Sequence, residues 1–344
     1  MSIGVSLLAM KEKFKALAQK EGFDLVSFLS PANYMTAGTF KEWLDKNFHG
    51  EMHYMERHLD AILNVEKIFD GYGTVIVLAA NYFTISLKKF WDDPSRGLIS
   101  KYAWGRDYHK VLKKKLKRIL RETGLNGRIY VDTGPILERE LAYRAGFGWI
   151  GKNAMLINRK LGSYLFLAEV ILKEKLEPDE EKFEPDLCYS CTRCIDACPT
   201  NAIVEPRIID ATRCIGYLTV EYRGIISEDL REKMGNWVFG CDICQEVCPY
   251  NQKIKPSNIE DFQPREGLLA PPLRELLTLT RDEFEKKFQG TPVRRSRYEG
   301  FIRNVIIAAG NSGKRDLKPI LEKLLKSGID LWIPHIKWAL ERLA

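Results

Sequence analysis

Residues 188–199 read CYSCTRCIDACP, and residues 241–249 read CDICQEVCP. Each stretch places cysteines two and three residues apart and ends in a proline. The spacing C-x2-C-x2-C-x3-C-P of the first stretch is typical of loops that hold 4Fe–4S clusters. All eight cysteines of the 344-residue chain lie between Cys188 and Cys248. The sequence therefore predicts a module with two 4Fe–4S clusters inside a longer chain.

The cysteines are expected to form two ligand sets that cross between the two runs. In such runs the cysteine next to proline ligates the other cluster. The first expected set is Cys188, Cys191, Cys194 and Cys248, and the second is Cys198, Cys214, Cys241 and Cys244. Cys214 stands well ahead of Cys241, so a long insertion interrupts the second run.

Disulfides and zinc are the two alternatives for these thiols. Residues 1–17, MSIGVSLLAMKEKFKAL, indicate an amphipathic helix that contains lysines rather than a signal peptide. Without export the thiols stay reduced, which disfavours disulfides. Zinc would need two sites of four thiolates, and zinc-binding cysteines usually come as pairs. The spacing therefore favours iron–sulfur clusters.

Length and composition describe a globular chain. At 344 residues it is long enough for two domains, or for one large domain with appendages. Its apolar fraction of 45% is ordinary. No apolar run reaches the roughly 20 residues that span a bilayer. We expect a cytoplasmic protein with no membrane segment, and the net charge of +7 permits a polyanionic partner.

Helical and strand patterns alternate before the cysteines, which predicts an α/β domain over residues 1–178. The expected helices are 5–21, 40–48, 110–123 and 135–145, and the expected strands are 24–29, 74–80, 128–131, 154–157 and 164–172.

Two further regions follow this domain. An acidic, proline-bearing linker leads into a ferredoxin-type module with two 4Fe–4S clusters over residues 179–255. Residues 256–344 carry only helical patterns, with helices expected at 301–309, 317–327 and 333–343. Such stacked helices are typical of a HEAT-like solenoid, and a plain helical cap is the alternative.

The segment Val131-Asp132-Thr133-Gly134-Pro135 is the first candidate for a reactive site. Its glycine permits close approach of a ligand to the backbone. Asp132 lies at the end of an expected strand and just before a helix, where α/β proteins tend to place their sites. The alternative is that Asp132 or Thr133 only caps the helix.

Three phrases together resemble epoxyqueuosine reductases, the family that makes the last step of the tRNA modification queuosine. They are VDTGPILERELAYRAGFGWIGKN at 131–153, CYSCTRCIDACPTNAI at 188–203 and FGCDICQEVCPYN at 239–251. The resemblance covers nearly the whole chain and extends to GEMHYMERH at 50–58, KYAWGRDYHKVLKKKL at 101–116, GSYLFLAEVIL at 162–172 and RRSRYEGFIRNVIIAAGN at 294–311.

The resemblance implies a cobalamin-binding catalytic domain over residues 1–178, fed by the two clusters from an external electron donor. The substrate would be a tRNA that carries epoxyqueuosine in its anticodon loop, and the epoxide oxygen would leave as water. The family members are expected to be monomers. The alternatives are an enzyme like the reductive dehalogenases, which also combine cobalamin with clusters, and a non-catalytic iron–sulfur electron carrier.

Asp132 matches the family's proton donor, and we expect burial to raise its pKa so that it can act as a neutral acid. The resemblance places the cobalamin contacts at Arg57, Tyr102, Asp132, Lys152, Asn153, Ser163 and Asp242. Gly216 stands where the family is expected to have serine. No histidine ligand for cobalt is expected, and His109 is interpreted as a surface or capping residue.

Basic residues gather in two places. The lysine-rich helix 110–121 is interpreted as a solvated face. The second group lies just before the C-terminal helices, and arginine suits bidentate contact with phosphate. We expect this group to hold the tRNA backbone; its members are Arg294, Arg295, Arg297 and Arg303.

Overall fold

A central four-stranded sheet organises the first half of the chain. The computed structural model describes residues 7–68 and 71–344, so the first two positions of the helix expected at 5–21 lie outside the described residues. The strand order is β1 (Leu25–Leu29), β2 (Thr74–Asn81), β7 (Leu165–Leu172) and β4 (Gly127–Tyr130). All three neighbouring pairs are antiparallel.

The antiparallel pairing differs from the parallel sheet that is usual in an α/β domain. All eight residues of β2 are buried, because both faces of the sheet are covered. A strand buried on both faces is apolar throughout whatever its direction. The run at 74–80 therefore predicts a central strand correctly but carries no information on its direction.

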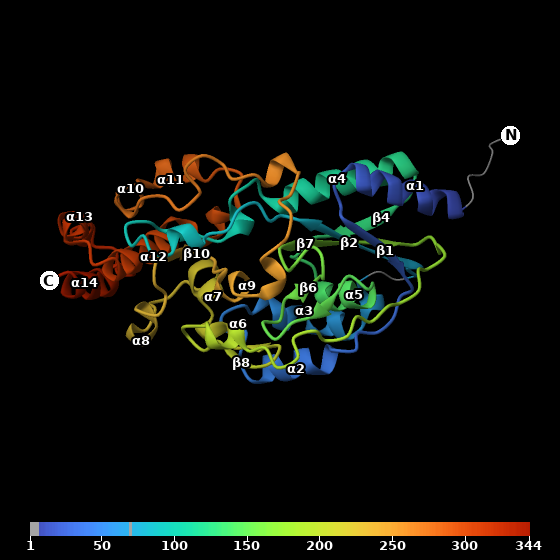
Figure 1. The fold of residues 1–344 in the computed structure, drawn as a ribbon, viewed down its shortest axis with the longest axis horizontal. Helices are drawn as coiled ribbons and strands as arrows, with labels where there is room; N and C mark the ends of the chain where they lie inside the picture. The colour runs from blue at the N-terminus through green and yellow to red at the C-terminus, as the bar shows by residue number, and fades with distance from the viewer. Residues whose placement is uncertain (1–6, 69–70) are drawn as a thin grey trace.

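Helices cover the two faces of the sheet (Figure 1). α1 (Leu7–Lys20) and α4 (Tyr108–Thr123) lie on one face, and α2 (Ala37–Asp45), α3 (Tyr54–Leu63) and α5 (Glu138–Arg144) lie on the other. On β7 the even-numbered residues join the core beneath α1 and α4, and the odd-numbered residues face α5. The sequence analysis missed α3, and it began α5 three residues too early.

The cysteine region is built from short elements. Its helices are α6 (Arg193–Asp196), α7 (Ile215–Val220), α8 (Glu228–Arg231) and α9 (Ile243–Glu246). Three small sheets accompany them: β5 (Trp149–Ile150) with β6 (Leu156–Ile157), β8 (Ile203–Glu205) with β9 (Ile208–Ile209), and β10 (Trp237–Phe239) in parallel with β3 (Leu98–Ile99). Short 3₁₀ segments lie at 65–67, 88–90, 101–103, 211–213, 249–251, 260–262, 292–296 and 315–317.

The remainder of the chain is helical, as expected. The helices are α10 (Leu273–Leu277), α11 (Arg281–Lys287), α12 (Arg297–Asn311), α13 (Lys318–Leu325) and α14 (Ile333–Arg342). α12 is buried along most of its length and packs against α14 and α10. The finer comparison with HEAT repeats stays an expectation.

One apolar cluster spans all three expected regions. It joins residues 87–104 of the first region, 211–239 of the second and 268–343 of the third. The pairing of β3 with β10 lies inside this cluster. Two further clusters on the faces of the four-stranded sheet belong almost entirely to the first region. The boundaries at 178 and 255 stay predictions. Within the described residues, every helix is too short or too polar to cross a bilayer.

Candidate active site

Asp132 occupies a tight, strained turn at the end of β4. Its φ is +58°, in the left-handed region that side chains other than glycine rarely adopt. The N–H of Thr133 donates to the carbonyl oxygen of Val131 at 2.6 Å, which closes a three-residue turn centred on Asp132. Turns of this kind with positive φ are rare and strained. Strain of this type concentrates at functional sites.

Two side chains from the first turn of α4 hold the Asp132 carboxylate. The Tyr108 hydroxyl donates to Oδ2 at 2.7 Å, and Nε2 of His109 lies 3.1 Å from the same oxygen. Partial burial opposes the charge, but these two hydrogen bonds and the nearby Arg295 lower the pKa of Asp132 to about 2. The expected rise in the pKa of Asp132 is therefore wrong, because hydrogen bonds to the charged form outweigh burial.

His109 belongs to the site, although the sequence analysis interpreted it as a surface or capping residue. It is buried and lies between two carboxylates, with Nδ1 2.8 Å from Asp107 and Nε2 3.1 Å from Asp132. Burial and Arg295 oppose its charge, but the two carboxylates raise the pKa of His109. The two carboxylates favour a protonated ring, but the guanidinium of Arg295, which can only donate, lies 2.9 Å from Nδ1 and 2.7 Å from Nε2.

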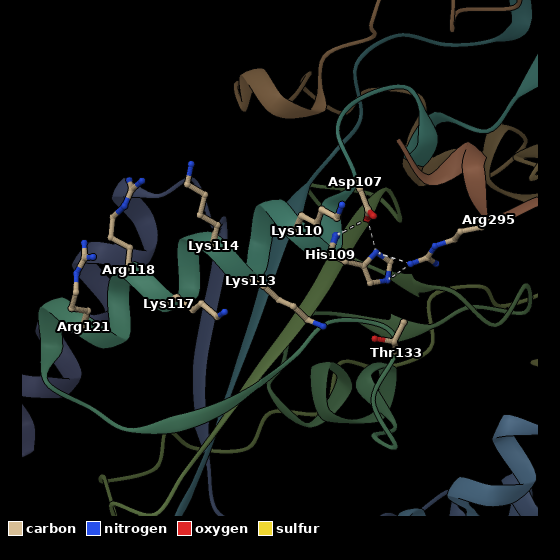
Figure 2. Close-up of a pocket in the computed structure, with 10 residues that line it drawn as sticks. All are labelled: Asp107, His109, Lys110, Lys113, Lys114, Lys117, Arg118, Arg121, Thr133 and Arg295. Atoms are coloured by element: carbon tan, nitrogen blue, oxygen red, sulfur yellow. Dashed lines mark hydrogen bonds and ion pairs between the residues drawn. The ribbon is translucent and has the colours of Figure 1, made fainter. Parts of the chain in front are cut away.

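Arg295 reaches the same group from the C-terminal region. Its Nη2 lies 2.7 Å from Nε2 of His109, and its Nη1 lies 3.6 Å from Asp132. Figure 2 shows His109 between Asp107 and Arg295 at one end of a cleft of about 780 Å³. The basic residues of α4 line the rest of this cleft: Lys110, Lys113, Lys114, Lys117, Arg118 and Arg121. The face interpreted as merely solvated therefore leads to Asp132.

The four arginines of the expected tRNA contact have different surroundings. Arg294 and Arg297 are exposed, and Arg294 pairs with Glu285. Arg295 lies in the site described above. Arg303 is 0% exposed, and its guanidinium donates to the carbonyl oxygens of residues 218, 222 and 224 and to Asn304. The prediction is wrong for Arg303, because a buried guanidinium cannot reach a phosphate.

The structure places the cysteines near one another, and their division into the two expected ligand sets stays a prediction. All eight thiols are free of disulfides. Burial raises the pKa of the Cys248 thiol to about 11. Smaller contributions to this rise come from the nearby thiols Cys188, Cys194 and Cys191. Burial also raises the pKa of the Cys244 thiol, and the thiols that add to this rise are Cys214, Cys194 and Cys198. Cys241 adjoins Cys244 and Cys214. Because Cys194 is also a neighbour of Cys244, the two expected sets are adjacent.

The two cysteine runs lie in different surroundings. We call residues 188–198 the outer run and residues 241–248 the inner run. Between the cysteines of the outer run no residue is buried, and Tyr189 is 73% exposed. Between those of the inner run, Asp242, Gln245 and Glu246 are all buried. The Trp149 indole donates to Sγ of Cys188 at 3.4 Å, a type of contact that tunes cluster potentials.

A buried ion network connects the inner run to the first half of the chain. The Lys101 side chain is 0% exposed and pairs with Glu246 and, at 3.4 Å, with Asp242. The Lys101 backbone N–H donates to Asp242 at 2.9 Å, and the Ser100 hydroxyl donates to the same carboxylate. Buried charges need such complete pairing. The network fixes the inner run against the segment that follows β3.

We call the inner run and this ion network the wall. Three of the expected cobalamin contacts are buried in the wall or directly against it. Asp242 is 0% exposed, and Asn153 and Ser163 are each 1% exposed. Ser163 donates to Gln245, and Asn153 donates to the carbonyl oxygen of Cys244. Direct contact by these side chains is contradicted, because protein groups already occupy their hydrogen-bonding atoms. They support the wall instead.

The other expected contacts retain some exposed surface. Asp132 is 50% exposed, and Tyr102 and Lys152 are half-buried. Arg57 lies on the exposed side of α3. At Gly216 an added Cβ would lie 3.6 Å from Sγ of Cys214, an ordinary contact, so the serine expected there would fit.

The charge of Asp132 contributes to the raised pKa values of two tyrosines. Burial, and then the charges of Glu221 and Asp132, raise the pKa of Tyr54 to about 12. Burial also raises the pKa of Tyr102, and Asp132 and Asp242 both add to this rise. The Tyr102 ring lies 6.3 Å from the ring of Tyr108, which bonds Asp132, and a Cβ added at Gly240, beside Cys241, would lie 3.2 Å from Tyr102. Tyr102 therefore lies next to the residue that holds Asp132 and next to the backbone where the inner run begins.

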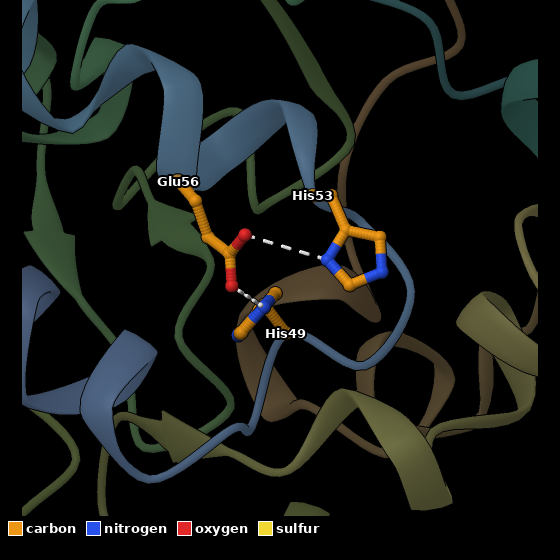
Figure 3. Close-up of side chains that lie close together, drawn as sticks. All are labelled: His49, His53 and Glu56. Carbon is orange, nitrogen blue, oxygen red and sulfur yellow. Dashed lines mark hydrogen bonds and ion pairs between the residues drawn. The ribbon is translucent and has the colours of Figure 1, made fainter.

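A second cluster of ligand-type side chains lies at the start of α3. Figure 3 shows the Glu56 carboxylate between His49, at 2.9 Å, and His53, at 3.4 Å. His53 and Glu56 are exposed. The pairing of one carboxylate with two imidazoles accounts for this cluster, so its geometry gives no reason to place a cation there.

These features define a class of protein: a redox enzyme in which an iron–sulfur module adjoins a strained, acid-bearing turn. Residues 187–251 match the family described as 4Fe-4S double cluster binding domain. Residues 63–133 match the family described as Epoxyqueuosine reductase QueG, DUF1730.

Comparisons with whole proteins agree with both matches. The chain is 42% identical to the epoxyqueuosine reductase of Cyclobacterium marinum, over 85% of this chain and 94% of that one. It is 38% identical to that of Escherichia coli K12, over 99% and 91%.

Solved structures give the same result. The structure of epoxyqueuosine reductase from Bacillus subtilis, with its catalytic loop swung out of the active site, has a TM-score of 0.86 and 27% identity, covering 98% of this chain and 91% of that one. An epoxyqueuosine reductase crystallised with an epoxyqueuosine-modified tRNA-Tyr stem loop has a TM-score of 0.82 and 27% identity, covering 98% and 100%.

The chain belongs to the epoxyqueuosine reductase family. It is an oxidoreductase that reduces epoxyqueuosine, and it contains a 4Fe–4S binding domain. This confirms the activity expected from the resemblance, and neither the dehalogenase nor the electron-carrier alternative is favoured.

Proposed function

We propose that the chain acts on epoxyqueuosine within a tRNA anticodon loop, using cobalamin that receives electrons through two 4Fe–4S clusters. The observation that carries the proposal is the position of Tyr102, next to Tyr108, which bonds Asp132, and next to Gly240, where the inner run begins. Electrons and protons can therefore meet at one place. The proposal includes an external electron donor, a monomeric state and a cytoplasmic location.

The proposed cysteine sets are the two expected sets. One cluster would be held by Cys188, Cys191, Cys194 and Cys248, and the other by Cys198, Cys214, Cys241 and Cys244. Four thiolates that meet in one group suit either a cubane cluster or zinc. The match of residues 187–251 to the double-cluster family supports iron.

The expected contact residues that retain exposed surface fit a large polar cofactor. Asp132, Tyr102 and Lys152 offer hydrogen-bonding groups to the amide side chains of a corrin ring, while Asn153, Ser163 and Asp242 stabilise the wall behind them. Bound cobalamin in its reduced form would supply a strongly reducing, nucleophilic metal. No described residue needs to ligate it, since His109 is already held by Asp107 and Asp132.

The chain's own residues would manage the protons. Loss of the epoxide oxygen as water takes two electrons and two protons. The pKa of Asp132 is lowered to about 2, and the neighbouring carboxylates raise the pKa of His109, which favours a proton on its ring. We therefore propose that the His109–Asp132 pair is the donor, with Asp132 at the substrate and His109 resupplying it. Tyr108 would orient the carboxylate through its 2.7 Å hydrogen bond.

The basic cleft along α4 is proposed as the path of the tRNA backbone, together with exposed Arg294 and Arg297. The cleft ends at His109, Thr133 and Arg295, so a strand held in it would place a splayed anticodon base near Asp132. The relative crystallised with a modified stem loop supports an RNA substrate of this kind.

One experiment tests the proposed function as a whole. Reconstituted chain is incubated anaerobically with cobalamin, a strong reductant and a stem loop that carries epoxyqueuosine, and nucleosides are analysed by mass spectrometry. We expect queuosine only when cobalamin is present. Absence of product from a sample with intact clusters and bound cobalamin would contradict the proposal.

A second experiment tests the RNA path. Lys114→Glu combined with Lys117→Glu should weaken stem-loop binding and flatten its dependence on salt, because fewer phosphates are neutralised. Lys323→Glu combined with Lys326→Glu on exposed positions of α13 and just beyond it gives the same change in net charge as a control. Equal affinity of the two double variants would count against the cleft.

A further inference from the structure

Two carboxyl groups that the proposed mechanism does not use lie beneath the Asp132 turn. Glu169 lies in the middle of β7 on the face toward α5, and it is 0% exposed. Among the described residues, no N–H or O–H group reaches either of its carboxylate oxygens. A buried, ionised carboxylate without a donor is very costly, so this group needs a proton.

Glu138, at the start of α5, is the carboxyl group that meets Glu169. Two carboxylates can form a hydrogen bond only when one of them is protonated. Burial raises the pKa of Glu138 to about 7, and burial together with the charge of Glu138 raises that of Glu169 well above its usual value. The pair therefore keeps at least one proton at neutral pH, and the two carboxyl groups can share it.

Few positively charged groups lie near this pair of carboxyl groups. Asp132 lies at the end of β4, Arg139 lies next along α5, and Tyr34 follows β1 close to Glu169. Tyr130 pairs directly with Glu169 across β4 and β7. Arg139 favours the charge on Glu138, and Asp132 opposes it.

Glu138 also makes the one described contact to the backbone N–H of Asp132. Its Oε1 accepts this hydrogen bond at 2.5 Å. Backbone strain like that at Asp132 costs about 1–3 kcal/mol and persists only where the surroundings enforce it. Glu138 is thus placed to enforce the turn from below, while Tyr108 and His109 hold the side chain from above.

We propose that Glu138 and Glu169 are positioning residues that share one proton and thereby hold the Asp132 turn in its strained conformation. This inference rests on the proposed function, in which Asp132 belongs to the proton donor. Glu169 holds Glu138 in place through the shared proton, and Glu138 holds the turn. Loss of the proton leaves two adjacent carboxylates that repel each other, so Glu138 moves away and the N–H of Asp132 loses its acceptor.

The sign of the pH dependence follows. Both pKa values of the pair are raised, that of Glu138 to about 7 and that of Glu169 well above its usual value, so the ordered turn binds a proton that the released turn loses. Order is favoured at low pH and is lost only as the pH rises past the raised pKa of both groups. In the Glu169→Gln variant the amide would donate to Glu138 at every pH. That variant should keep the turn ordered at alkaline pH.

Hydrogen–deuterium exchange of the peptide that contains residues 131–135, in the holoenzyme at pH 6 and pH 9, tests the proposal. After correction for intrinsic exchange, protection in the parent chain should fall at least about tenfold between the two pH values, as expected when a hydrogen bond to a charged acceptor is lost. Glu169→Gln should keep its protection and shift the alkaline limb of turnover upward. Glu122→Gln on exposed α4 surface is the control and should behave like the parent.

Several results would overturn the inference. One is that protection of residues 131–135 from exchange does not change with pH in the parent chain. Another is that this protection depends on pH in Glu169→Gln as strongly as it does in the parent. If Glu169→Gln does not fold, Glu138→Gln replaces it, because its amide can accept from Asp132 and donate to Glu169; it too should lose the pH dependence. Asp132→Asn separates the two ideas: full activity in that variant contradicts the proposed role of Asp132, while the exchange measurement still reports on the carboxyl pair.

Discussion

The outer and inner cysteine runs have nearly the same spacing but opposite surroundings. The outer run is flanked by exposed residues such as Tyr189, whereas the inner run encloses Asp242 and Glu246, which are bonded to buried Lys101. Local spacing is what a cluster needs, and it is alike in both. The difference therefore concerns what lies around each cluster. We call the cluster expected at Cys188, Cys191, Cys194 and Cys248 the outer cluster, and the one expected at Cys198, Cys214, Cys241 and Cys244 the inner cluster. We infer that the outer cluster receives electrons from the donor and that the inner cluster passes them toward the Asp132 site.

The largest effect should come from removing one ligand from each run. Cys244→Ser should abolish epoxyqueuosine reduction with any reductant, because the inner cluster adjoins the site. Cys191→Ser should lose the outer cluster but keep measurable turnover with a small, strong reductant that bypasses it. Product formation and the electron paramagnetic resonance of the remaining cluster give the answer. Equal loss in both variants would remove the proposed order of electron transfer.

Asp132→Asn should impair proton donation and leave electron transfer intact. Both clusters should still be reduced and cobalamin should still bind, but turnover should fall about 10²–10⁴-fold, the usual worth of a positioned acid. Single-turnover assays followed by nucleoside mass spectrometry measure this. A variant that turns over at the parent rate would show that the proton comes from elsewhere.

The ion pairs beside the two runs should differ in their contribution to stability. Lys101→Met leaves two buried carboxylates without a cation and should cost about 3–5 kcal/mol. Arg207→Met breaks a pair with Asp186 that is about 40% exposed on each side and should cost at most about 1 kcal/mol. Midpoints of anaerobic urea unfolding compare the two. Similar shifts would mean that the two environments are less different than the burial indicates.

The smallest expected effect is the order in which iron is lost. Under limited oxidant with a chelator, the outer cluster should lose its iron first, since exposed residues surround it. Iron content and cluster spectra followed over time should show two phases. A single phase, in which both spectra decay together, would be the contrary result.

The sequence predicts the parts of this molecule that depend on local spacing. The cysteine sets, the buried strand at 74–80 and the C-terminal helices all follow from patterns within short windows. The reactive position of Asp132 follows from the resemblance, because its family motif lies at the end of a strand. These predictions need no knowledge of how distant segments pack.

What the sequence could not reveal depends on contacts between distant segments. His109 reads as a helix-capping residue until β4 brings Asp132 to it, and the Asp107-Tyr108-His109 triplet was the available signal. Arg303 reads as a phosphate ligand until α12 buries it among the carbonyl oxygens of residues 218–224. The lowered pKa of Asp132 has the same origin, since its partners come from α4 and from the C-terminal region.

The parallel pairing of β3 with β10 has a consequence for how the chain is made. Leu98 and Ile99 leave the ribosome long before Trp237 and Phe239, and residues 188–198 emerge between them. The apolar surface around β3 must stay open until its partner is synthesised, and such long-range pairing is slow and prone to aggregation. Each expected cysteine set also includes a residue beyond β10, so neither cluster can be completed before the partner strand of β3 is made. The unfinished chain therefore most needs a chaperone before cluster assembly can be completed.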